Sequence, residues 1–237
     1  MPPLLLPEAK EKYQGTLDID IALDFKEIDD QTYNTLVDIL KKKDYYQKEG
    51  EQPFKYYRDV EGMTIEIDLL AAEYGGTGMR RRHQNVQDAK ARKARGCDLV
   101  FDDFVRVELS GVMPGGTENK VSVKIASIGP FLVTKGMALW TRMKEKDAFD
   151  IYYCVRNYPG GLVALQDKIK PLVTNKLAQE GFGKIRAKFE AVNSTGPNFV
   201  ADFLEIAEPE EREIIKREAF ELINALMDKI KIDFFSE

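Results

Sequence analysis

Two aspartates stand two residues apart inside an apolar stretch near the start of the chain. In residues 15–23, GTLDIDIAL, Asp18 and Asp20 alternate with apolar side chains. On a β-strand, residues i and i+2 point to the same face, so the carboxylates would lie roughly 6 to 7 Å apart along the strand. Two acids this close repel each other in a partly buried position unless a cation lies between them. Mg²⁺ suits such a pair, because it takes a few carboxylates and completes its shell with water and phosphate oxygens.

A third acid, Asp68, lies on a later stretch with the same alternation. In residues 63–70, MTIEIDLL, Glu66 and Asp68 alternate with apolar side chains. If the two strands are neighbours in one sheet, Asp18, Asp20 and Asp68 (the acid triad) converge, and three such acids can hold two Mg²⁺ for in-line phosphoryl transfer. The reaction class then narrows to nucleotidyl transfer or phosphodiester cleavage. The alternative is that the acids mark the solvated face of an edge strand, but the second acid-bearing strand favours a metal site.

The elements that would position these acids are strands and a helix in the first part of the chain. Alternation predicts strands, and a 3.6-residue period predicts one helix. The expected strands span residues 16–23, 54–60 and 63–70, and the expected helix spans residues 28–43. Residues 104–109 and 120–126 flank a turn-rich segment and are typical of a long hairpin.

From residue 131 onward the composition becomes helical. The first helical segment would stop at Pro159-Gly160-Gly161, and further helices are expected over residues 162–180, 181–192, 197–206 and 208–231. The predicted fold class is therefore α+β. We expect a mixed sheet with flanking helices in a catalytic domain over residues 1–130, followed by a helical part over residues 131–237.

Bulk properties limit the function classes. The 237 residues are 43% hydrophobic and 32% charged, which is typical of a folded globular protein, and the net charge of −5 gives no global attraction to nucleic acid or acidic membranes. No stretch is long enough to span a membrane, and residues 1–13 lack the features of a signal peptide. Cys97 and Cys154 show no disulfide or metal-ligand spacing and read as small buried hydrophobes. Two cysteines without a disulfide pattern fit best with a protein of the reducing cytoplasm.

The motifs and their order resemble those of a known superfamily. GTLDIDIAL resembles the strand that carries the paired metal-binding acids in the polymerase β-like nucleotidyltransferases, and MTIEIDLL resembles their third-acid strand. Residues 131–153, FLVTKGMALWTRMKEKDAFDIYY, are similar to the helical signature of the AbiEii-type nucleotidyltransferases, a family that includes toxins of bacterial toxin-antitoxin and phage-defence systems. The resemblance covers residues 15 to about 160.

This resemblance implies roles for particular residues. The acid triad would bind Mg²⁺, with Asp68 completing the site or acting as general base on the acceptor hydroxyl. Lys135 matches the family's helical lysine, which is expected to meet the NTP phosphates, and Asp147 and Asp150 match the acids of its K-D-x-x-D element. The alternative is an ordinary helix, in which Lys146 and Asp150 form an i,i+4 pair and Asp147 is solvated.

One part of the superfamily pattern is missing. The pattern begins with a strand that ends in G-G or G-S ahead of the paired acids and admits the triphosphate close to the backbone. Residues 1–14 contain no such motif, and Gly15 adjoins the acids too closely to replace it. Either the chain uses another phosphate cradle, or it starts late and lacks its first strand. We favour the late start, which makes catalytic activity of this chain a question for experiment.

A basic segment over residues 79–96 carries seven lysines and arginines and the only histidine, His83. It could hold NTP phosphates or a nucleic-acid backbone, or it could be a solvated helix, because its later basic residues wind around such a helix. Arg82 and His83 follow the Asp68 strand and a glycine-rich loop, so they would lie nearest the cleft. Arg82 is the expected phosphate ligand, and His83 receives no acid–base role.

The sequence thus predicts a Mg²⁺-dependent nucleotidyltransferase that transfers NMP from an NTP to an acceptor. RNA (including tRNA), a protein hydroxyl and a small molecule all stay open as that acceptor, and a cognate antitoxin is expected if the protein is a toxin. Two alternatives stay open. One is an inert nucleotidyltransferase-like module that acts through a partner protein. The other is a metal nuclease, against which stands the lack of a suitably placed lysine beside Asp68.

Overall fold

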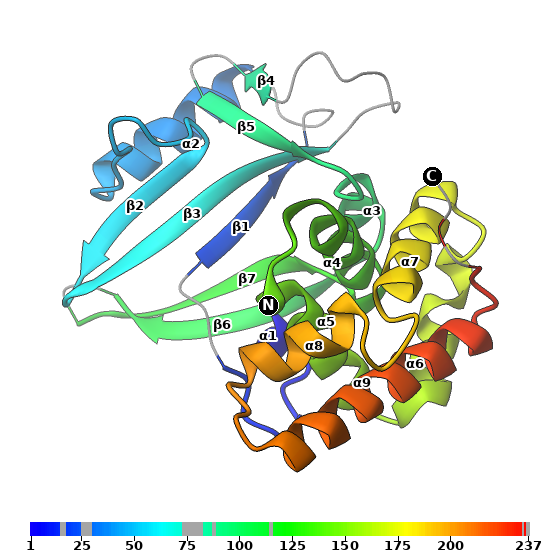
Figure 1. Cartoon of the computed structure of the whole chain (residues 1–237). Coiled ribbons are helices and arrows are strands. Elements are labelled where there is room, and N and C mark those ends of the chain that lie inside the picture. Colours follow the sequence, from blue (N-terminus) through cyan, green and yellow to red (C-terminus); the bar gives the residue numbers. More distant parts are fainter. Residues whose placement is uncertain are drawn as a thin grey trace. The chain divides into compact units, whose positions relative to one another are not determined.

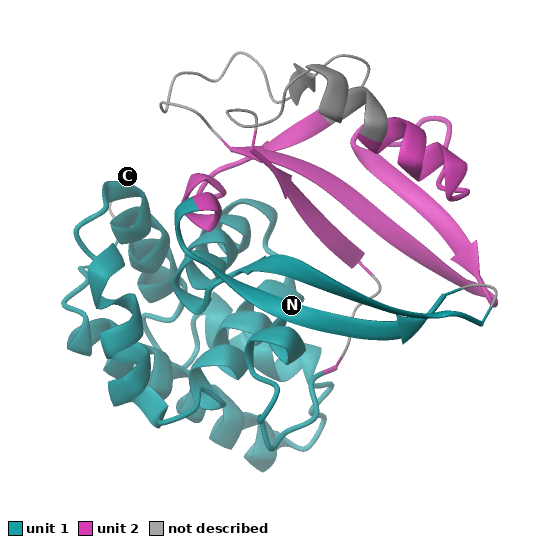
Figure 2. Cartoon of the chain, turned by 180° about the vertical axis from the view of Figure 1, so that it is seen from behind, with its two compact units in different colours: residues 1–13, 102–237 teal, residues 14–101 magenta. Residues whose placement is uncertain are grey.

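The computed structural model describes residues 1–14, 18–24, 30–72, 83–86, 89–113, 116–233 and 235 (Figure 1). These residues form a five-stranded mixed sheet, a two-stranded sheet and several helices, which confirms the α+β class. The chain divides into two compact units, one of residues 14–101 and one of residues 1–13 with 102–237 (Figure 2). Among the helices of the described ranges, none has the length and apolar character of a membrane span.

The unit of residues 14–101 is built on a five-stranded mixed sheet. Its strands are β1 (Asp18–Leu23), β2 (Lys55–Val60), β3 (Met63–Ala72), β4 (His83–Val86) and β5 (Ala89–Ala94). The long strand β3 pairs in parallel with β1 along one edge. Its other edge pairs with antiparallel β2 and then, near the end of β3, with parallel β5. Strand β4 pairs antiparallel to β5. The strands predicted around the acids are thus confirmed.

One face of this sheet carries the hydrophobic core. Helix α2 (Asp30–Lys42) covers it and contributes Leu36, Val37 and Leu40. Alternate residues of β1 and β3 meet that helix, among them Leu23 and Leu69. Because the strand period is two, burying these apolar residues turns the intervening acids to the opposite face.

The turn between β2 and β3 fixes their register. Glu61 and Gly62 have φ angles of 50° and 82°. Two consecutive positive φ angles in a two-residue loop match the right-handed twist of a hairpin, and glycine adopts such an angle without strain. As a result, each residue of β2 has a defined partner on β3.

The other unit combines a hairpin with a group of helices. The hairpin consists of β6 (Phe104–Val112) and β7 (Glu118–Ala126), which confirms the predicted pair of strands. The helices are α1 (Pro2–Leu5), α4 (Ile128–Arg142), α5 (Glu145–Arg156), α6 (Gly161–Ile169), the 3₁₀ turn η2 (Lys170–Leu172), α7 (Lys176–Lys188), α8 (Thr195–Phe203) and α9 (Pro209–Lys229). Helix α3 (Asp98–Asp102) lies where the chain passes between units.

The observed division differs from the predicted boundary at residue 130. The hairpin belongs with the helices, because Ser127 at its end donates a backbone hydrogen bond to Asp103 and leads directly into α4. The first residues also return to this unit, where the Tyr153 hydroxyl donates to the Glu11 carbonyl at 2.6 Å.

Two helix boundaries were wrong in the sequence prediction. The segment from residue 131 is two helices, because Met143 takes a left-handed conformation with φ 50° and ends α4. The break expected at Gly181 falls earlier, where the Asn175 side chain accepts the Leu177 and Ala178 amides and caps α7. Gly181 lies inside α7 instead. A Cβ there would come within 2.7 Å of a Val133 methyl, so this glycine permits close packing of α7 on α4.

Candidate active site

The acid triad lies on one face of the sheet. Asp20 is the register partner of Asp68 across β1 and β3, and Asp18 is the partner of Glu66. Partners on adjacent strands project to the same side, and neighbouring strands are about 4.8 Å apart. Asp18 and Asp20 are exposed, whereas Glu66 and Asp68 are half-buried. These four residues, here named the acidic face, lie opposite the core under α2. The condition for the acids to share a face, that the two acid-bearing strands are neighbours in one sheet, is met.

Lys55 joins the acidic face from the other edge of β3. It is the register partner of Asp68 on β2, so it projects to the same side as the acids. Its ammonium nitrogen contacts Glu66 Oε1 and lies 3.2 Å from Asp68 Oδ1. The sequence interpretation found no lysine beside Asp68, and that was wrong. Counting outward from the two-residue turn at Glu61-Gly62 would have placed residue 55 opposite residue 68.

Asp68 has an oxygen whose hydrogen-bonding capacity is unused. Its Oδ1 is buried and, among the described residues, has no partner in hydrogen-bond geometry, although Lys55 is close enough for an ion pair. A buried carboxylate oxygen without a hydrogen bond is costly, so such atoms often mark the place of a missing ion or water. This oxygen therefore fits a cation ligand.

The donor set of the acidic face suits Mg²⁺, which prefers carboxylate oxygens. In their present positions, the side chains of the acidic face do not form a metal-binding site. Across the part of the chain that the structure describes, no three His, Cys, Asp or Glu side chains are gathered closely enough to hold a metal. Glu66 and Asp68 are turned towards Lys55. The acids fit the metal in chemistry and in strand position, and binding would require their side chains to turn from the lysine.

Lys135, Asp147 and Asp150 lie together in the other unit, on α4 and α5. The Lys135 ammonium is 3.0 Å from Asp147 Oδ1 and 2.6 Å from Asp150 Oδ2. Both aspartates are buried, with exposed fractions of 0% and 1%, so the alternative of a solvated Asp147 is wrong. The i,i+4 ion pair that the same alternative expected is present, since Lys146 Nζ lies 3.5 Å from Asp150 Oδ2. Lysine and acids are thus brought together as a buried ionic cluster.

Further groups complete this ionic cluster. Arg142 donates two hydrogen bonds to Asp147, from Nε at 2.6 Å and Nη2 at 2.7 Å. The Tyr13 hydroxyl donates to Asp150 Oδ1 at 2.6 Å. Burial opposes ionisation of Asp147, but Arg142 and Lys135 outweigh it and hold the pKa of Asp147 below its usual value. Burial also opposes charging of Lys135, yet the two acids raise the pKa of its ammonium. The cluster is therefore charged and internally compensated.

The basic segment is only partly described. Arg82 lies outside the described residues, and of His83 the structure gives the backbone alone, as the first residue of β4. Residues 83–86 and 89–94 form strands β4 and β5, so the alternative of a solvated helix was wrong there. Arg92 lies over the Phe54 ring, with 5.4 Å between guanidinium carbon and centroid.

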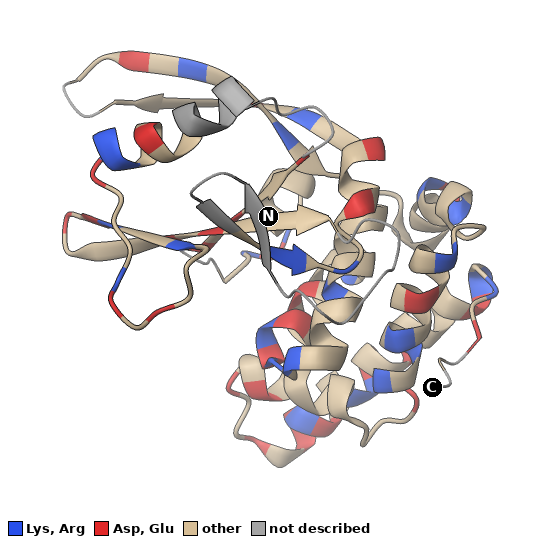
Figure 3. Ribbon diagram, turned by 90° about the horizontal axis from the view of Figure 1, so that it is seen from above, with Lys and Arg blue, Asp and Glu red and all other residues tan. Residues whose placement is uncertain are grey.

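In the other unit, acidic and basic residues are interspersed along the helices (Figure 3).

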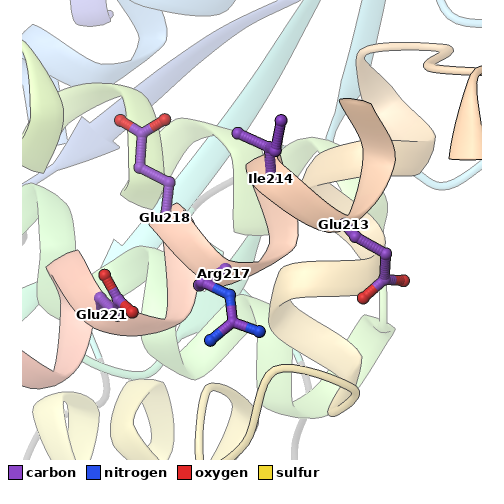
Figure 4. Close-up of a pocket in the computed structure, with 5 residues that line it drawn as sticks. All are labelled: Glu213, Ile214, Arg217, Glu218 and Glu221. Carbon is purple, nitrogen blue, oxygen red and sulfur yellow. The ribbon is translucent and has the colours of Figure 1, made fainter. Parts of the chain in front are cut away.

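Two further features are the cysteines and a surface pocket. Cys97 and Cys154 are buried, as predicted, and burial raises the pKa of Cys97 to about 12, so both behave as small apolar residues. A surface pocket lies on α9, and Figure 4 shows the residues that line it. It is lined by Glu213, Ile214, Arg217, Glu218 and Glu221, all from this one helix. None of the predicted site residues lines it.

Comparison with known proteins adds no identification. No protein-family model matches the chain, and no curated protein or solved structure matches it either. Function must therefore be inferred from the residues themselves.

Proposed function

We propose that the chain is a Mg²⁺-dependent nucleotidyltransferase that moves NMP from an NTP to an acceptor hydroxyl. One observation carries this proposal: Asp20 and Asp68, far apart in sequence, are register partners on parallel strands, with Asp18 beside them on the same face. Three carboxylates on one sheet face, one of them half-buried, repel one another unless a cation lies between them, and an all-carboxylate set is the one that Mg²⁺ takes. The resemblance of both strands to nucleotidyltransferase motifs supports the same activity.

The chemistry follows from the acids. The acceptor oxygen forms a bond to the α-phosphorus while the bond from that phosphorus to the bridging oxygen breaks, and pyrophosphate leaves. Asp18, Asp20 and Asp68 would hold Mg²⁺, which supplies charge neutralisation on the triphosphate and its leaving group. Asp68 alternatively accepts the proton of the acceptor hydroxyl. Being half-buried, it is better placed than the exposed Asp18 and Asp20 for a role that needs partial desolvation.

The acceptor in this proposal is an RNA end, including that of tRNA, or a protein hydroxyl, and the reaction takes place in the cytoplasm. A toxin role with a cognate antitoxin is part of the proposal by resemblance alone. The phosphate roles of Arg82 and Lys135 and those of Asp147 and Asp150 stay predictions. Lys135 has three N–H groups, and Asp147 and Asp150 lie at ion-pairing distance from it, which limits what it can offer a phosphate.

The test is transfer of label from each α-labelled NTP, with Mg²⁺, to total RNA or total protein. The wild type is compared with Asp20→Ala and with Asp38→Ala, a matched control on the exposed side of α2. We expect label on one acceptor class with wild type and Asp38→Ala and at least 100-fold less with Asp20→Ala, because one member of a catalytic set is lost.

A sample that includes any in-frame sequence upstream of residue 1 is assayed in parallel. No transfer by either sample would defeat the proposal. Absence of NTP binding as well as of transfer in the sample with upstream sequence would favour the inert module that acts through a partner protein.

A second candidate is a metal-dependent phosphodiesterase. The position of Lys55 favours it, because carboxylates with an adjacent lysine can bind a metal and orient an attacking water. Cleavage of plain RNA or DNA without any NTP, abolished by both Asp20→Ala and Lys55→Ala, would select this activity over transfer.

A further inference from the structure

Lys55 is a positive charge placed directly among the acids. The acidic face carries four carboxylates, and the Lys55 ammonium reaches the two that belong to β3, Glu66 and Asp68. All three side chains are partly buried, with exposed fractions of 22%, 26% and 13%. Because like charges on adjacent strands repel, the lysine stabilises the face when no other cation is bound.

The ammonium and a divalent cation need the same oxygens. Lys55 is paired with Asp68, a member of the acid triad, and its nitrogen lies 3.2 Å from the buried Oδ1 that lacks a hydrogen bond. A carboxylate that turns to Mg²⁺ brings the metal within about 2.1 Å of its oxygen. Two cations at such spacing repel strongly in a partly buried site. Binding of the metal to Asp68 therefore weakens the ion pair between Asp68 and Lys55, and this ion pair in turn weakens metal binding.

We propose that Lys55 holds the acidic face in the absence of metal, yields its carboxylates to Mg²⁺, and then turns its ammonium to a phosphate oxygen of the substrate. The last step rests on the proposed function. A lysine suits this exchange, because its flexible four-carbon stem carries a point charge with three rotatable donors and demands no fixed geometry from its partner.

The first test is a Mn²⁺ titration without nucleotide, followed by the electron paramagnetic resonance signal of free Mn²⁺. Wild type is compared with Lys55→Met, with Lys55→Arg, and with Lys41→Met, which removes the same charge from the exposed surface of α2. We expect Lys55→Met to bind Mn²⁺ about three- to tenfold more tightly than wild type, because the competing ammonium is removed. The effect is modest because solvent partly screens that charge in wild type. Lys55→Arg and Lys41→Met should bind no more tightly than wild type. Equal or weaker binding by Lys55→Met, or no binding by any sample, would overturn the proposal.

The second test measures binding of the α,β-methylene analogues of the four NTPs at saturating Mn²⁺, since these cannot undergo transfer. Lys55→Met should bind the preferred analogue at least fivefold more weakly than wild type, and Lys55→Arg should recover most of the loss. Unchanged affinity in Lys55→Met would overturn the phosphate step.

These results separate the inference from the proposed function. Absent label transfer together with tighter Mn²⁺ binding by Lys55→Met defeats the function and leaves the metal competition standing. Label transfer by wild type together with unchanged Mn²⁺ binding by Lys55→Met supports the function and defeats the metal competition.

Discussion

Asp20 and Asp68 are register partners on the adjacent parallel strands β1 and β3, although helix α2 and strand β2 lie between them in the chain. Parallel pairing of β1 with β3 requires such a crossover, and α2 supplies it while it covers the apolar face. The same arrangement that buries the core therefore collects the acids on the other side of the sheet.

Removing one acid should stabilise the metal-free protein. Asp20→Asn relieves repulsion within the acidic face, so we expect its free energy of unfolding in EDTA to rise by about 0.5 kcal/mol, within the range for like charges directly opposite on a sheet. Urea unfolding in EDTA measures this change, with Asp38→Asn as the control that removes an exposed acid elsewhere. A clear loss of stability in Asp20→Asn would show that this carboxylate is satisfied without metal.

The buried ionic cluster should respond strongly to loss of Lys135. Lys135→Met leaves Asp147 and Asp150 buried without their shared ammonium, and breaking a buried pair in this way costs about 3 to 5 kcal/mol. Lys146→Met is the control, because the Lys146 side chain is 30% exposed and its ammonium lies 3.5 Å from Asp150, so its loss should cost under about 1 kcal/mol. Urea denaturation compares the two, and equal effects would contradict a special role for Lys135.

Acid should weaken the same cluster. The pKa of Asp147 is lowered in the folded protein from its usual 3.8, so its ionisation stabilises the fold above about that pH and is lost as the pH falls through the lower folded pKa. Urea midpoints measured from pH 5 down to pH 2.5 should fall more steeply for wild type than for Asp147→Asn. Parallel curves would mean that Asp147 contributes nothing to acid sensitivity.

The contact between α4 and α7 should tolerate no added methyl group at Gly136. A Cβ there would lie 2.3 Å from the Gly181 carbonyl oxygen, a backbone atom that can move only with its helix. Gly136→Ala should therefore lower the free energy of unfolding by about 1 to 3 kcal/mol despite alanine's better helix propensity. Gly111→Ala, where a Cβ meets nothing within 4 Å, should change the same free energy by under about 0.5 kcal/mol. A neutral Gly136→Ala would show that the helices separate easily.

Short-range patterns predicted much of the sheet. The alternation of Leu23 and Leu69 with acids identified both strands, and the hairpin turn at Glu61-Gly62 was readable from residue types. The sequence placed Asp20 and Asp68 together only on the condition that their strands are neighbours in one sheet, and the parallel pairing of β1 with β3 meets that condition.

The features that sequence reasoning missed have different causes. The pairing of Lys55 with Asp68 follows from the hairpin register that the turn at Glu61-Gly62 sets, so it could have been predicted by counting outward from that turn. A helix boundary was expected between residues 180 and 181, whereas Gly181 lies inside α7 and permits its close packing on Val133. Asp147 was open to a solvated interpretation, since its burial is decided by how α4 packs on α5.

The most direct test of a metal site on the acidic face is Mn²⁺ binding by wild type, Asp20→Asn, Asp68→Asn and the control Asp38→Asn. If the registered acids of β1 and β3 form one site, Asp20→Asn and Asp68→Asn should each bind Mn²⁺ at least tenfold more weakly than wild type, while Asp38→Asn should bind as wild type does. Equal affinity in all four proteins would contradict the site, and with it the catalytic function proposed for these acids.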